Sequence, residues 1–459
     1  MAHGGNAGTR REFLEGAGRI ATASALAGTS IPAVHAAEQN TIRLALIGSG
    51  SRGGGATIDA LSVANGPIEL VAMADVFQER LEGTYHRVAA AIRKEGCSGT
   101  INVPKDRQFV GFDAYRKAMD CLKPGDVAIL AAPPAFRWPH YQYAIEKGLH
   151  VFIEKPLAVD GPTARRMLAL GREASKKNLK TGVGLVIRHC RARQALHERI
   201  RDGQIGDIVA LRTYRMQSLV AGYIGRNETG LSELLYQVQR FHAFLWASGG
   251  AFSDYYIHTI DECCWMKDAL PVEAQANGGR HSRGEMIDQN FDHYSVEYTF
   301  ADGAKLFAFG RCMPGCYQEF SSYAHGTKGL GVITTSGHLA GRCRTYRGQA
   351  VAKRNLLWQF PKAEENPYRL EWWDLIEAIR QDKPYNEVEC GVNASIVASM
   401  GRMAAHTGRV VTFDAMLNCQ HEFAPDVDKL TMTSPAPLQA GPDGRYPVPQ
   451  PGIVTDREY

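Results

Sequence analysis

The chain has little net charge and, beyond residue 37, no long apolar run. Both absences narrow the range of functions that the chain could have. Its 459 residues include 52 lysines and arginines against 48 aspartates and glutamates, a formal charge of +4. No long basic run breaks this balance, so we expect no nucleic-acid partner. Beyond residue 37, no apolar run reaches the roughly 18 residues that a membrane helix needs. The mature chain is therefore expected to have no membrane span.

Metal-binding spacings are also lacking. The ten cysteines include Cys312 and Cys316, which are too widely separated for a C-x-x-C metal knuckle. We therefore expect no metal site. A further set of candidate ligands matches no common zinc pattern and consists of His242, His258, Cys263 and Cys264.

The N-terminus has the pattern of an export signal. Arg10 and Arg11 precede a weakly apolar stretch over 20–33, and small residues follow near Ala36 and Ala37. This pattern is read by the twin-arginine export machinery, which carries folded proteins. Residues 1–37 are thus predicted to be a signal peptide, and the mature protein to be periplasmic or otherwise exported. Because folding would take place in a reducing cytosol, we expect free buried thiols rather than disulfides.

A glycine-rich turn follows the first buried strand pattern, 42–47, and has the sequence Gly-Ser-Gly-Ser-Arg-Gly. In such a turn the glycines allow a tight bend, the approach of a pyrophosphate and close packing of the next helix. Asp75 ends a second strand pattern, where a carboxylate binds ribose hydroxyls and repels a 2′-phosphate. NAD is therefore favoured, although Arg52 leaves NADP open. The predicted cofactor-binding residues are Gly48, Gly50, Ser51, Arg52, Gly53, Asp75, Pro133, Glu154 and Lys155.

Helical and strand-like patterns alternate through the N-terminal half. This alternation predicts a doubly wound parallel sheet, a Rossmann domain, over 38–190. Ligands of such sheets bind at the carboxyl ends of the strands, where Asp75, Pro133 and Lys155 fall. After the first two strands, the expected strands are 126–132, 148–153 and 181–187, and the expected helices are 112–122, 140–147 and 163–177.

The second half has a different pattern. Strand-like stretches at 207–216, 292–300 and 304–310 are separated by hairpin-type turns such as Ala301-Asp302-Gly303. A helical pattern follows over 368–381. The tail 419–459 is rich in proline and glycine, which indicates an irregular wrapping or a flexible segment.

Several motifs in order resemble the glucose–fructose oxidoreductase / inositol dehydrogenase / rhizopine catabolism (Gfo/Idh/MocA) family. They are the glycine turn, Glu154-Lys155-Pro156-Leu157, the D-x-x-x-H run 254–258, and the Gly-Thr-Lys-Gly turn 326–329. The resemblance covers about 42–417 and is greatest to exported members with twin-arginine signals. It implies an α/β chain with a C-terminal α+β substrate and oligomerisation domain over 191–418. That domain's large, open, mostly antiparallel sheet implies a homodimer or homotetramer.

The resemblance also implies a catalytic set of Lys155, Asp254 and His258. Asp254 and His258 are four residues apart in an expected helix, so their side chains would share one face. His258 would then be the general base, oriented by Asp254, with Lys155 as acid or polarising group. From spacing alone, the Asp254–His258 pair is more typical of a surface pair or a helix cap.

Further residues are candidates for substrate contact. His140 follows the Pro133-Pro134 strand end, and Arg188 follows another strand. Tyr236 and Tyr255 belong to a group of aromatic residues near Asp254, and aromatic faces with polar edges suit sugar rings. A structural role fits each of these residues equally well.

Three functions remain open at this point. The first is an exported NAD(P)-dependent oxidoreductase that acts on a hydroxyl of a sugar, a sugar derivative or a glycoside and recycles a tightly bound nucleotide. The second is a redox-neutral glycoside hydrolase, which oxidises a ring carbon transiently and for which Tyr255, Tyr256 or His258 would be the base. The third is a non-catalytic, nucleotide-bound, sugar-binding protein.

Overall fold

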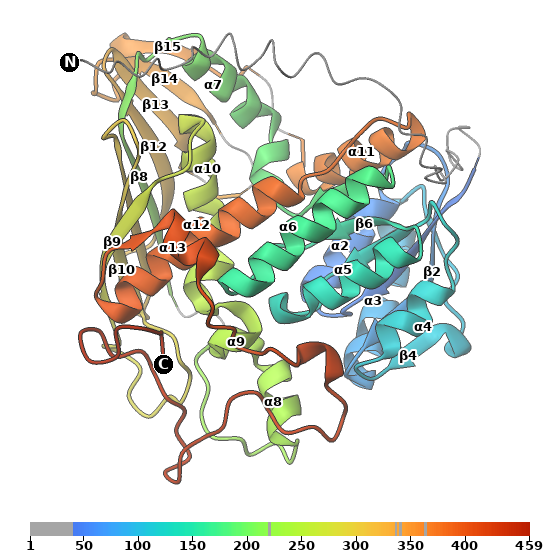
Figure 1. The fold of residues 1–459 in the computed structure, drawn as a ribbon. Helices are drawn as coiled ribbons and strands as arrows, with labels where there is room; N and C mark the ends of the chain where they lie inside the picture. Colours follow the sequence, from blue (N-terminus) through green and yellow to red (C-terminus); the bar gives the residue numbers. More distant parts are fainter. Residues whose placement is uncertain (1–39, 219–221, 336, 339–341, 362–364) are drawn as a thin grey trace, which may run out of the picture. The chain divides into compact units, whose positions relative to one another are not determined.

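The first β-sheet is parallel and is ordered β3-β2-β1-β5-β6-β7, with β4 also paired to β2. The computed structural model in Figure 1 describes residues 40–218, 222–335, 337–338, 342–361 and 365–459. The predicted signal peptide lies outside these residues. The strands are β1 (Ile42–Ile47), β2 (Ile68–Asp75), β3 (Thr100–Ile101), β4 (Gln108–Val110), β5 (Val127–Leu130), β6 (His150–Ile153) and β7 (Thr181–Val183).

Helices cover both faces of this sheet, because alternate strand residues are apolar on both sides. In β1, Leu44 and Leu46 pack with α2, α3 and α11, whereas Ala45 and Ile47 belong to the core that includes α4, α5 and α6. The predicted doubly wound sheet is therefore confirmed. The helices are α2 (Ser51–Leu61), α3 (Gln78–Glu95), α4 (Ala114–Asp120), α5 (Arg137–Glu146), α6 (Gly161–Lys176) and α11 (Pro367–Arg380).

The last predicted strand of this sheet is shorter than its apolar run. Strand β7 ends at Val183, and a 3-10 helix covers Val186–His189. The chain leaves the sheet at Gly184, where a Cβ would press on the buried carboxylate of Glu154. The expected strand to Ile187 was therefore wrong in its second half.

The second sheet has nine strands, ordered β15-β14-β13-β12-β8-β11-β10-β9-β16. Neighbouring strands are antiparallel except β8 and β11, so the predicted mostly antiparallel sheet is confirmed. The strands are β8 (Ile208–Gln217), β9 (Glu273–Gly279), β10 (His293–Thr299), β11 (Lys305–Cys312), β12 (Glu319–Gly326), β13 (Gly329–Thr334), β14 (Arg344–Arg347), β15 (Leu356–Gln359) and β16 (Val411–Thr412).

Two helices connect the second sheet to the rest. Helix α10 packs on β8 and β12, and α12 lies between β9 and α6 (Figure 1). Helix α11 returns to the first sheet, where Trp372 stacks on Phe152 at 4.4 Å. The domain boundaries inferred from the sequence remain predictions. The other helices are α7 (Arg191–Arg201), α8 (Glu233–Gln239), α9 (Leu245–Ser248), α10 (Ile257–Lys267), α12 (Val388–Thr407) and α13 (Phe413–Asn418).

The tail after Cys419 is irregular apart from one short 3-10 helix, and it wraps past α9 and α8 (Figure 1). Its end is anchored by charge. Glu458 accepts hydrogen bonds from the fully buried Arg402, at 2.8 and 2.9 Å, and lies 2.8 Å from Nδ1 of His406. Breaking a buried ion pair of this kind costs about 3–5 kcal/mol. The alternative of an irregular wrapping segment is therefore the one that the structure supports.

All ten cysteines lie within the described chain and are free, as expected, but only five of them are buried and the other five are partly exposed. None of the helices in the described ranges is long and apolar enough to cross a membrane.

Candidate active site

A cavity of about 800 Å³ opens at the carboxyl ends of β1, β2, β5 and β6. Its wall continues to residues of the second sheet and of the segment ahead of α10. Every predicted cofactor-binding and catalytic residue lies in this wall, although their roles remain predictions. The predicted residues that line it are Gly48, Gly50, Ser51, Arg52, Gly53, Asp75, Pro133, His140, Glu154, Lys155, Asp254, Tyr255 and His258.

The glycine turn has the shape that a pyrophosphate requires. A side chain at Gly48, where φ is +93°, would overlap the backbone of Ala132, and one at Gly53 would overlap the carbonyl of Gly48. By contrast, a Cβ at Gly50 would have no atom of the chain within 4 Å. Gly50 is also the N-cap of α2 and makes no side-chain cap. The helix N-terminus therefore faces open space with free N–H groups, as a bound phosphate needs.

Asp75 ends β2 and lies beside the glycine turn, as its predicted role toward the adenosine ribose requires. Its Oδ2 accepts from the N–H of Ser49 at 2.6 Å, and its Oδ1 accepts from that of Phe77 at 2.9 Å. Burial raises the pKa of Asp75 above its usual value, and these N–H groups oppose that effect. A carboxylate has about four acceptor positions, so Asp75 keeps capacity for ribose hydroxyls.

Arg52 does not serve the 2′-phosphate role that the sequence left open. Its guanidinium contacts Glu154 at 2.5 Å, Glu371 at 3.0 Å and Asp59 at 3.4 Å. It also lies over the ring of Tyr368. Because three carboxylates surround its guanidinium, Arg52 does not favour NADP.

The carboxylate of Asp254 is the centre of the reacting end. Lys155 Nζ donates to its Oδ1 at 2.9 Å and to its backbone carbonyl at 2.5 Å, and His242 Nδ1 lies 2.9 Å from its Oδ2. Burial opposes ionisation of Asp254, but Lys155 and His242 outweigh it and hold its pKa below the usual range. Asp254 is thus a permanent anion that fixes the lysine and one histidine.

The expected pairing of Asp254 with His258 was wrong. Asp254 lies in a π-helical turn, Phe252–Tyr256, and α10 begins only at Ile257. The wider turn removes the regular i,i+4 alignment on which the expectation depended. His242, which follows α8, takes the position beside the carboxylate.

His258 is left without a hydrogen-bonding partner among the described residues, and its Nδ1 is buried. Its ring packs against His338, 4.3 Å between centroids. Burial, with the nearby His338, Lys155 and Arg215, lowers the pKa of His258 well below the usual value. His258 is therefore neutral at physiological pH, and a neutral imidazole can accept a proton.

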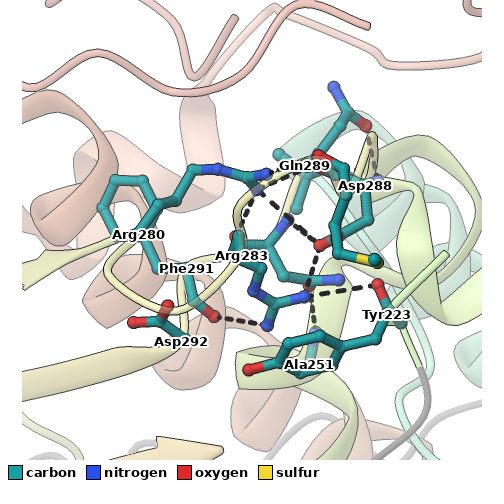
Figure 2. Close-up of polar contacts among 12 residues, drawn as sticks. Tyr223, Ala251, Arg280, Arg283, Asp288, Gln289, Phe291 and Asp292 are labelled. Atoms are coloured by element: carbon teal, nitrogen blue, oxygen red, sulfur yellow. Dashed lines mark hydrogen bonds and ion pairs between the residues drawn. The ribbon is translucent and has the colours of Figure 1, made fainter. Parts of the chain in front are cut away.

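A polar loop holds His242 and Asp254 in place. Asn290 accepts from the N–H of Ala251 at 2.7 Å and donates to the carbonyl of His242 at 2.9 Å. Figure 2 shows the support of this loop: Arg283 and Arg280 converge on Asp288, near Ala251. The Asp288 carboxylate also accepts from the N–H of Asn290 at 3.0 Å. One amide side chain thus ties together the two segments that pair at the site.

Two of the four predicted substrate residues line the cavity and two do not. Tyr255 and His140 line the cavity, but His140 packs among Tyr115 and Phe136, and burial lowers its pKa to about 3. Neither Arg188 nor Tyr236 is among the lining residues.

Each of these two exceptions has another partner, which corrects the expectation of substrate contact. Arg188 forms a bidentate ion pair with Asp261, at 2.8 and 2.9 Å. Tyr236 is buried and donates to the carbonyl of Gly225 at 2.8 Å.

Sequence reasoning missed several residues in the cavity wall. Arg215 comes from β8, and His338 and Tyr368 come from segments far along the chain. The place of His242 beside Asp254 is marked by no spacing in the sequence either. No local motif identifies these positions, because tertiary packing brings them to the cavity. No group of three or more His, Cys, Asp or Glu side chains in the described ranges is arranged to bind a metal.

Two family models match the parts of the chain that supply most of the residues lining the cavity. Residues 42–184 match an oxidoreductase family with an NAD-binding Rossmann fold, and residues 193–330 match the GFO/IDH/MocA C-terminal domain. The chain belongs to the Gfo/Idh/MocA family. It is therefore an NAD-binding oxidoreductase with the two-part fold described above.

Individual relatives are more distant. A 1,5-anhydro-D-fructose reductase of Ensifer adhaerens is 28% identical over 40% of this chain, and the match spans 50% of that enzyme. An aldose-aldose oxidoreductase of Caulobacter crescentus is 18% identical, with a TM-score of 0.60 over 81% of this chain and all of that one. A scyllo-inositol dehydrogenase of Lactobacillus casei with NAD(H) and scyllo-inositol is 19% identical, with a TM-score of 0.56 over 82% of this chain and all of that one.

The glycine turn yields a direct test of the nucleotide site. In Gly50→Ala, the new methyl group meets no atom of the chain, so the melting temperature should stay within about 2 °C of the wild type. The methyl group would lie where the pyrophosphate approaches, so NAD affinity should fall at least about tenfold. Calorimetric titration and thermal unfolding measure the two effects. Unchanged NAD affinity would show that the nucleotide does not approach Gly50.

Proposed function

We propose that this oxidoreductase oxidises a hydroxyl group of a sugar, a polyol or a related derivative with NAD. The main support for this proposal is that His258 lines the same cavity as Lys155 and the glycine turn. His258 is neutral and has no hydrogen-bond partner among the described residues, and Lys155 is bound to Asp254. The names of the relatives, an anhydrofructose reductase and an inositol dehydrogenase among them, support this substrate class.

The proton chemistry is assigned to residues of the chain. When bound, NAD supplies the hydride acceptor for the carbinol carbon. His258 accepts the proton of the hydroxyl group: its imidazole is neutral and lines the cavity, although its lowered pKa makes it a weaker base than an ordinary histidine. Lys155 has three N–H donors, and two of them go to Asp254. The third can donate to the substrate oxygen as negative charge develops on it.

The tyrosine base of a redox-neutral hydrolase has less support. Tyr256 is buried beside Cys312 and does not line the cavity. Tyr255 does line it, but burial and the adjacent Asp254 raise the pKa of its hydroxyl well above the usual value. A tyrosine with a raised pKa is a poor base near neutral pH.

We also propose the cellular setting and the assembly. The twin-arginine pattern supports export with the nucleotide already bound, and a compartment without fresh NAD favours a cofactor that is held tightly and recycled.

The second sheet supports a homodimer or homotetramer, because its ring contacts Tyr214–Phe309 and Arg212–Tyr323 are only partly buried. Sedimentation velocity of the mature protein would report its mass.

The reaction is tested with purified protein, no added cofactor, and a panel of sugars, polyols and glycosides. We expect a product two hydrogens lighter than its substrate by mass spectrometry. The protein-bound nucleotide should become reduced, or an added acceptor should be consumed.

Lys155→Met and His258→Gln should lower the rate by about 10²–10⁴-fold, because each loses a group that handles the proton. The exposed His86→Gln is the matched control. A glycoside split by water without net redox change would favour the hydrolase instead.

Export is tested separately. Changing Arg10 and Arg11 together to lysine, in the full chain fused to a reporter, should keep the protein in the cytoplasm. Cell fractionation reports the location. Export of the double variant at the wild-type level would contradict the twin-arginine assignment.

A further inference from the structure

Most positive charges at the reacting end of the cavity already have partners. Lys155 is bound to Asp254, and Arg52 contacts three carboxylates. Arg137 is buried and donates to the backbone carbonyls of Pro156 and Ala132. Among the described lining residues, these three cations are therefore committed to the chain itself.

Arg215 is different. It comes from β8 and lines the same cavity, with its guanidinium carbon 3.9 Å from the ring centroid of Phe320. Its Nε is buried and unpaired within the described part of the chain, as is that of Arg137, but Arg137 donates through its two terminal nitrogens whereas the guanidinium of Arg215 makes no hydrogen bond to these residues. None of the carboxylates in these ranges forms an ion pair with its guanidinium. A buried polar group of this kind normally requires a hydrogen-bond acceptor.

The surroundings of Arg215 place it next to the reacting groups. Phe320 lies opposite Arg215 in the sheet register, and its ring is 5.0 Å from that of His338. His338 in turn packs on His258. Arg215 and Lys155 both lower the pKa of His258, which shows that the two cations lie near the same imidazole. The guanidinium and His258 therefore line the same cavity and lie close to each other.

We propose that Arg215 binds a carboxylate of the substrate, so that this enzyme acts on an acidic sugar such as a uronic or aldonic acid. This inference rests on the proposed function and specifies its substrate class. Leaving the buried Nε of Arg215 without an acceptor is costly, and a carboxylate matches the guanidinium fork with two parallel hydrogen bonds.

The charge count favours a carboxylate over a phosphate. Lys155 and Arg52 are balanced by carboxylates of the chain, and both terminal nitrogens of Arg137 donate to backbone carbonyls. Among the described residues at this end, Arg215 is thus the cation that is left for a single negative charge. The nucleotide phosphates have their own place at the glycine turn, where Arg87 lies beside Gly50 and Ser51. Arg215 comes from the second sheet, whereas the glycine turn belongs to the first.

The test is equilibrium binding to the NAD-loaded protein by calorimetric titration. The ligands are matched pairs, glucose with glucuronate and galactose with galacturonate, and glucose 6-phosphate is the phosphate arm. We expect the wild type to bind each uronate at least about tenfold more tightly than its neutral partner. Arg215→Gln should lose that preference through a roughly 10- to 100-fold loss of uronate affinity, and Arg215→Lys should keep part of it. Arg212→Gln, on the same strand but bonded to His325, should keep it in full.

Three results would overturn the inference: equal wild-type affinity for both members of each pair, tighter binding of the sugar phosphate, or a uronate preference that persists in Arg215→Gln. A loss of NAD affinity in Arg215→Gln would instead assign the residue to the cofactor and would also overturn it. Oxidation of neutral sugars alone would leave the proposed function intact while this inference fails. Arg215-dependent uronate binding without any oxidation would show the reverse.

Discussion

The buried carboxylate of Asp254 is the interaction on which the site depends. Lys155 reaches it from the end of β6 in the first sheet, and His242 reaches it from the segment after α8. Asp254 itself precedes α10, which packs on the second sheet. A buried anion needs paired charges and hydrogen bonds, so the loss of Lys155 or of His242 would leave Asp254 with only one of its two partners. The same contact therefore connects the elements of both sheets and builds the reacting end of the cavity.

This commitment of Asp254 determines the roles of the other groups. Because its oxygens are taken by Lys155 and His242, His258 has no carboxylate partner among the described residues and remains neutral. Lys155 is held in place while one donor remains for substrate. Below it, Arg52 is neutralised by carboxylates of the chain. The proposed proton acceptor, hydrogen-bond donor and substrate-binding cation thus lie in the wall of a single cavity.

The sequence predicted those parts of the site that local patterns encode. The apolar run of β1, the glycine turn and Asp75 are neighbours along the chain or lie at a strand end, so their positions followed from the parallel-sheet rule. Pairings across long sequence separations could not be found in this way. Asp254 is 99 residues from Lys155, and Arg188 is 73 residues from the Asp261 that binds it. The π-helical turn before α10 also leaves no pattern that spacing at four residues would detect.

The most direct test of this account is the protonation state of His258, measured by ¹⁵N NMR of the histidine ring nitrogens in the NAD-loaded protein. Burial without a carboxylate partner in the described chain predicts a neutral ring at about pH 7 that stays neutral when the pH is lowered to about 6. In Asp254→Asn, the signals of His242 should move more than those of His258. An imidazolium signal from His258 at about pH 6.5, near the ordinary histidine pKa, would contradict the account. So would a His258 signal that follows the Asp254 substitution more closely than that of His242.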